Sequence, residues 1–123
     1  MQMLVSTENG TVLIDSFADI EAVIRRSAAR GMAEIWLSGD AHYPAIAILL
    51  NGDHACVDFF GTDNGNIKMT PGNYPHEIMF RAGGEEWLAP ANAVISLDEA
   101  VLCAEEFCHS LNLPACVTWQ DGV

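Results

Sequence analysis

The chain has 123 residues, half of them hydrophobic, and its 17 acidic residues face five basic ones, giving a formal net charge of −12 at pH 7. We expect one domain, residues 1–123, with a sizeable core. Because the acids are scattered and not gathered in a tail, they predict a folded acidic surface that repels nucleic acid and anionic membranes and attracts basic partners. A simpler interpretation is that the acidity only keeps the protein soluble.

The hydropathy of the chain predicts a cytoplasmic protein. No apolar run reaches the length of about 18 residues that a transmembrane helix needs. The first residues lack the basic and long apolar regions of a secretory signal.

The first half of the chain predicts strands around one helix. Two short strands, 3–7 and 11–15, flank a turn at residues 8–10. A helix is expected to begin at Asp15 or Ser16 and to end at Gly31. Its core-facing positions recur at helical spacing: Phe17, Ile20, Val23, Ile24 and Ala28.

Three further strands are predicted before the middle of the chain. Residues 32–38 alternate like a half-buried strand, and residues 43–50 are apolar on both faces, as is typical of a central strand. Residues 54–60 form the antiparallel return after a turn at 51–53.

The second half predicts short strands and a capped helix. Strands are expected at 67–69, 77–81 and 86–88, and a last strand at 116–119. Ser96 and Glu99 have the spacing of a capping box at the start of a helix that stops near Asn112 and Pro114. The elements together predict an α+β fold, a single mainly antiparallel β-sheet with two helices packed on one face and the other face partly open.

Catalytic and metal-binding patterns are missing from the sequence. There is no nucleophile elbow, phosphate-binding loop, zinc-protease motif or dinucleotide fingerprint, so we expect no enzyme. His54 and Asp58 share a strand face, but their Cα atoms would lie roughly 13 Å apart, too far for an acid–base pair. The cysteines lack metal-ligand spacing and are expected to be buried free thiols, with no metal and no cofactor. They are Cys56, Cys103, Cys108 and Cys116.

Strand alternation predicts a binding surface on the open sheet face. If Ile35 and Leu37 face the helices, Glu34 and Trp36 face the other way. The same argument adds Asp58 and Glu77 to this face, and nearby turns add a second set: Asp40, Asp53, Asp63, Glu85 and Glu86. Acids around an aromatic residue suit a basic protein partner. The alternative is that Trp36 belongs to the core and the acids are merely solvated.

Residues 94–120 carry a family resemblance. The segments Val94–Ala100, Ala104–Phe107 and Val117–Gln120 resemble the end of the Imm1 family of bacterial immunity proteins, with its acid-capped helix containing a Glu-Phe pair, then a proline and a final V-x-W. The sequence departs from the family pattern at Asn112-Leu113, which replaces the usual glycine before Pro114. The resemblance is strong over residues 94–120 and loose over most of the chain.

The resemblance implies a cytoplasmic antidote that binds and neutralises a cognate toxin of a polymorphic or interbacterial system. Several such toxins are nucleic-acid deaminases and others are nucleases, and either needs a basic surface for phosphates that an acidic protein can cover. The matching residues belong to the scaffold, so no binding residue is transferred by position. Two other functions stay open: an acidic adaptor or regulatory domain with a different protein partner, and a small-molecule-binding domain or minor enzyme that uses the open sheet face.

Overall fold

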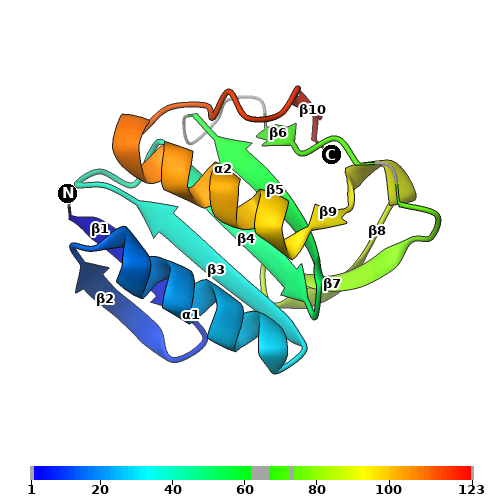
Figure 1. The fold of residues 1–123 in the computed structure, drawn as a ribbon, viewed down its shortest axis with the longest axis horizontal. Helices are drawn as coiled ribbons and strands as arrows, with labels where there is room; N and C mark the ends of the chain where they lie inside the picture. The colour runs from blue at the N-terminus through cyan, green and yellow to red at the C-terminus, as the bar shows by residue number, and fades with distance from the viewer. Residues whose placement is uncertain (1, 62–66, 73, 123) are drawn as a thin grey trace.

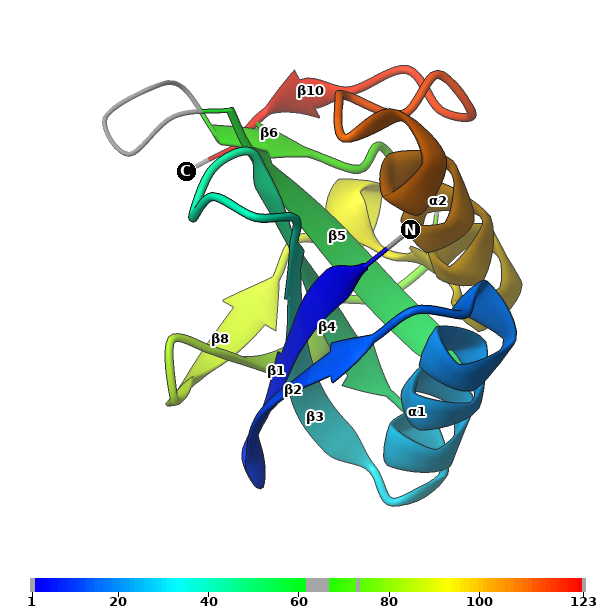
Figure 2. The same cartoon turned by 90° about the vertical axis from the view of Figure 1, so that its left-hand side faces the viewer.

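An antiparallel sheet lies between two layers, with helices on one face and a β-hairpin on part of the other (Figures 1 and 2). The structure is a computed structural model and describes residues 2–61, 67–72 and 74–122. This arrangement confirms the predicted α+β class with a mainly antiparallel sheet and two helices on one face.

The large sheet has the strand order β10-β6-β5-β4-β3-β1-β2, and every pair in it is antiparallel. Its strands are β1 (Met3–Thr7), β2 (Gly10–Ile14), β3 (Met32–Ser38), β4 (Ala45–Asn51), β5 (His54–Phe60), β6 (Ile67–Met69) and β10 (Gln120–Asp121). A two-residue strand, β9 (Ile95–Ser96), pairs with β5. The central strand β4 is buried on both faces except at its last residue, which explains its unbroken apolar sequence.

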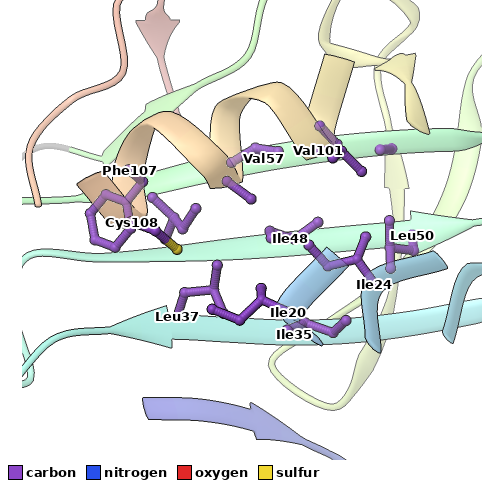
Figure 3. Packing of buried hydrophobic residues seen from close by; sticks show 14 of the residues in the cluster. Ile20, Ile24, Ile35, Leu37, Ile48, Leu50, Val57, Val101, Phe107 and Cys108 are labelled. Carbon is purple, nitrogen blue, oxygen red and sulfur yellow. The ribbon is translucent and has the colours of Figure 1, made fainter. Parts of the chain in front are cut away.

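The helices α1 (Phe17–Ala29) and α2 (Leu97–Ser110) cover one sheet face and enclose the larger core. In Figure 3 the helix residues Ile20, Ile24, Val101, Phe107 and Cys108 lie over the sheet residues Ile35, Leu37, Ile48, Leu50 and Val57. The predicted capping box of α2 is present: Ser96 Oγ accepts from the Glu99 amide at 3.1 Å, and Glu99 Oε1 accepts from the Ser96 amide at 3.2 Å. Ser16 stands at the N-cap of α1 without a side-chain capping bond.

The opposite sheet face is more covered than the sequence predicted. A hairpin of β7 (Ile78–Ala82) and β8 (Glu85–Ala89), followed by the short helix η1 (Ala91–Ala93), packs against it. Phe80 of β7 is fully buried and joins Leu49 and Cys56 of the large sheet in a second core. Asn51 anchors the hairpin, since its side-chain amide donates to the carbonyl of Met79 at 2.9 Å.

The C-terminal strand was predicted wrongly. Residues 116–119 are not a strand; β10 begins at Gln120 and pairs with Met69 and Lys68 of β6. The cause is local, because the Trp119 indole N–H donates to the carbonyl of Pro114 at 2.6 Å and folds this stretch back on itself. Cys116 is therefore exposed and not buried as predicted, whereas the other three thiols are buried. Among the described residues, neither helix is long and apolar enough to cross a membrane.

Candidate partner-binding surface

Trp36 lies on the sheet face away from the helices, as alternation along β3 predicted. It is half-buried, and its ring centroid lies 4.9 Å from that of Phe60 on β5. The strand between them carries Ala45 and Ala47, which pair with Phe60 and Trp36 respectively. Because these side chains are small, the two large rings can meet above β4. Trp36 thus packs against the second core with one part of its ring and reaches the surface with another, and its role in binding a partner stays a prediction.

Glu34 joins Trp36 to the tip of the β7–β8 hairpin. Its Oε2 accepts from the Trp36 indole N–H at 2.9 Å and from the Gly83 amide at 2.8 Å, and its Oε1 accepts from the Gly84 amide at 3.2 Å. Both glycines have positive φ, 62° and 82°, which presents successive amides to one carboxylate and disfavours any other residue there. Glu34 therefore holds the tryptophan and the hairpin in place.

Asp58 follows two residues after Cys56 on the same side of β5, and it pairs with Ala47 next to Trp36. Burial, together with the smaller effect of the nearby Glu34 carboxylate, raises the pKa of the Asp58 carboxyl to about 6. Burial likewise raises the pKa of the Cys56 thiol to about 12, with Asp58 adding to the shift. The charge on this part of the face therefore depends on pH near neutrality.

Two hollows meet at Trp36. One, of about 220 Å³, is lined by Trp36, Ser38, His42 and Tyr43. The other, of about 210 Å³, lies toward the hairpin and includes Glu8, Glu34 and Arg81. Ser6 and Trp36 line both, so a shallow interrupted groove crosses the uncovered part of the sheet face with the tryptophan at its centre.

The remaining predicted residues are spread more widely. Asp40 is exposed in the loop after β3 that also holds His42 and Tyr43, and Glu85 and Glu86 are exposed just after the glycines bound by Glu34. Glu77 is exposed but precedes β7 of the small sheet, so it does not share the large sheet face as predicted.

The last two predicted residues lie elsewhere. Asp53 is exposed in the turn between β4 and β5, at the opposite sheet end from Asp40, where it lines a hollow of about 580 Å³ with Tyr74 and Glu99. Asp63 lies outside the described residues.

Two surface residues near Trp36 were missed by sequence reasoning. Tyr43 is 39% exposed and lines the hollow beyond Ser38, and Glu8 lines the hollow toward the hairpin, where its carboxylate lies 3.8 Å from Arg81. The sequence indicates only a turn at Glu8. Nothing in the local pattern shows that the β1–β2 turn and the β7–β8 hairpin meet, because their residues are far apart in the chain.

The groove offers aromatic faces, and the exposed carboxylates of Asp40, Glu85 and Glu86 neighbour residues that line it. Aromatic faces and carboxylates together suit cationic side chains of a protein partner. Within the described residues, no group of three or more His, Cys, Asp or Glu side chains is arranged to hold a metal ion. A small α+β scaffold with an acidic, aromatic-centred surface has the form of a protein-binding module.

The chain belongs to the Imm1 family of immunity proteins. The family model described as Immunity protein Imm1 matches residues 8–121, nearly the whole chain. The match confirms the resemblance noted at residues 94–120 and extends it to both helices and almost every strand. No curated protein matches the sequence.

Proposed function

We propose that this protein acts in the bacterial cytoplasm by binding a cognate toxin domain and blocking it. The observation that carries the proposal is the family match over residues 8–121. An immunity protein of this kind needs no chemistry of its own; tight occupancy of the toxin's working surface is enough.

The proposed target is a nucleic-acid deaminase, with a nuclease as the second choice, and the charge of the chain supports it. A toxin that acts on nucleic acid carries a basic surface that neutralises phosphates. A protein with net charge −12 is attracted to that surface and is steered to it before contact. Carboxylates would then take the places of phosphates, and an aromatic ring could take the place of a base.

The proposed contact region is the groove centred on Trp36. It combines a half-buried aromatic residue, the partly exposed Tyr43 and three exposed acids that neighbour its lining residues and that we take as its rim: Asp40, Glu85 and Glu86. Buried aromatic anchors surrounded by polar rims dominate binding energy in protein interfaces. Glu34 contributes by fixing the Trp36 ring, since its carboxylate is already held by three donors.

Co-expression tests the function. The toxin domain encoded beside this protein should kill the host cell alone and should be tolerated when this protein is present. Purified toxin should lose its deaminase or nuclease activity on addition of an equimolar amount of this protein. Cell death in both conditions, with no complex between the purified proteins, would overturn the proposal.

A second experiment tests the contact region separately. The double variant Glu85→Lys/Glu86→Lys and the single variant Tyr43→Ala should weaken the complex. The control Asp15→Lys/Glu105→Lys makes the same change in net charge at exposed acids on the helix side of the sheet. Equal loss in the charge variant and its control would show that only net charge matters, and an unchanged complex in all of them would place the interface elsewhere.

A further inference from the structure

Strand β2 is a long sheet edge without the usual protection. It pairs with β1 on one side only and ends the strand order. The residues Thr11 to Ile14 include no charge and no proline, the devices with which natural edge strands avoid pairing. The other edges differ: β10 has only two residues, and β8 carries the exposed Glu85 and Glu86.

Both faces of this edge are apolar. Leu13 is 62% exposed, the largest exposure among the big apolar side chains of the described residues, and Val12 is 56% exposed, a value that only Leu102 equals. Val12 pairs with Val5, which lies in the core under the helices, and Leu13 pairs with Leu4 on the other side of the sheet. A strand added here would therefore gain backbone hydrogen bonds and apolar contacts above and below the sheet.

The helix beside this edge has opposite charges at its two ends. Asp19, Val23, Arg26 and Arg30 are spaced to share one face of α1. A hollow of about 200 Å³ is lined by residues of both elements: Val23, Arg26 and Arg30 from the helix side, and Gly10 and Val12 from β2. This helix face is therefore turned toward β2.

Neither Arg26 nor Arg30 forms an ion pair with any of the described residues. Arg25, one position away, is engaged by Glu21 at 2.8 Å and by Asp98 at 3.0 Å. The basic end of α1 beside β2 therefore has charge to offer to a partner.

The direction of β2 fixes how these charges would meet. Because β2 leads through Asp15 and Ser16 into α1, its Ile14 end lies at the acidic end of the helix. Its Gly10 end lies at the end with Arg26 and Arg30. An antiparallel copy of the edge keeps both helices on the same face of the joined sheet and would set the acidic end of one helix toward the basic end of the other. A parallel copy would place the second helix on the opposite face, away from these charges.

We propose that a second copy of this chain pairs with β2, antiparallel and about a two-fold axis, so that the two large sheets become continuous. Charge complementarity favours a second copy as the partner. In this arrangement Asp19 of each copy faces Arg26 and Arg30 of the other. The pairing buries little area and sets two acidic molecules together, so the dimer is weak and forms with rising concentration. Trp36 lies two strands away, on β3.

Sedimentation velocity over a concentration series into the high micromolar range tests the pairing. We expect the wild-type protein to shift reversibly from monomer to dimer. Leu13→Lys should raise the dimer Kd by at least about tenfold, because it puts a charge on the free edge. Leu102→Lys is the matched control, an equally simple change at a leucine of α2 that is 56% exposed. A wild-type protein that stays monomeric throughout, or a dimer that Leu13→Lys leaves intact, would overturn the proposal.

A charge swap tests the antiparallel arrangement without altering the edge strand. Asp19→Arg and Arg26→Asp should each weaken the dimer, and the double variant should restore it, because each new charge meets its complement on the other copy. Circular dichroism would show that each variant is folded. A double variant weaker than both single variants would rule out the antiparallel pairing.

Discussion

Glu34 and Trp36, two residues apart on β3, fix one another: the indole N–H donates to a carboxylate oxygen at 2.9 Å, and the same carboxylate receives the amides of Gly83 and Gly84. A residue predicted from its charge to meet a partner is thus occupied inside the protein. Both side chains are half-buried, and the three hydrogen bonds to the Glu34 carboxylate leave the Trp36 ring as the member of this pair without a polar partner on its face.

Glu34→Ala should lower the free energy of unfolding by about 2 kcal/mol, because three donors lose a charged acceptor and the hairpin tip loses its anchor. Glu85→Ala is the control, at an exposed acid of the same hairpin whose side chain makes no hydrogen bond or ion pair within the described residues. Urea unfolding compares the two. NMR should show faster amide exchange at Gly83 and Gly84 in the Glu34 variant alone; equal effects of both substitutions would contradict the assigned role.

The two helix N-caps should respond differently to the same substitution. Ser96→Ala removes a side-chain acceptor that the structure shows in use, and we expect it to cost about 1 kcal/mol of unfolding free energy. Ser16→Ala should cost clearly less, because Ser16 makes no side-chain capping bond. Chemical denaturation of the two variants checks this order, and a larger loss at Ser16 would count against it.

Asp58 should make stability fall as pH rises toward neutrality. Burial raises its pKa from 3.8 to about 6, so the folded protein holds the proton more tightly than the unfolded chain does. The stabilisation from this proton is complete below about pH 4 and is lost as the pH rises through about 6, amounting to ~3 kcal/mol for a shift of this size.

Asp58→Asn should therefore stabilise the protein at about pH 7.5 by ~1–3 kcal/mol and change little at about pH 4. Asp40→Asn, at an exposed loop position, is the control. Urea unfolding at both pH values measures the difference, and a gain of the same size at the two pH values would remove the titration argument.

The sequence predicts most of this fold because its signals are local. Alternation places Ile35 and Leu37 toward the helices and Trp36 away from them, and the spacing of Ser96 and Glu99 marks the start of α2. The last strand fails for a physical reason: apolar residues before Trp119 resemble a strand, but a hydrogen bond from its ring to Pro114 turns the chain instead.

The candidate site is less predictable because it depends on contacts between distant segments. Alternation cannot show that the β7–β8 hairpin folds over β3 and β4, so it cannot show that Glu34 is engaged or that Glu77 lies on a different sheet. The same contacts bring Glu8 beside Arg81 and make a groove at Trp36.

Cys116 should be the first of the four thiols to react in the folded protein. It is exposed, whereas Cys56, Cys103 and Cys108 are buried. Partial burial is the largest of the effects on the Cys116 thiol and raises its pKa. The reactive thiolate form is therefore scarce at neutral pH. Iodoacetamide should therefore modify only Cys116 in the folded protein, slowly at neutral pH and faster as the pH rises. After unfolding it should modify all four thiols. Mass spectrometry of the peptides identifies the modified thiol. The Sγ atom of Cys103 lies 3.1 Å from that of Cys116 but is buried, so fast labelling of Cys103 in the native protein would contradict the structure.

Association with the toxin should depend on salt mainly through its rate of formation. Charges that are exposed on the rim, such as Asp40, Glu85 and Glu86, act over a Debye length that falls from about 10 Å at 0.1 M salt to about 3 Å at 1 M. We expect the association rate constant to fall at least about tenfold over this range, because steering is lost. The dissociation rate should change much less, since the aromatic contacts at Trp36 and Tyr43 do not depend on salt. Stopped-flow measurements separate the two rates; an association rate that does not respond to salt would remove electrostatic steering from the mechanism while leaving the family assignment intact.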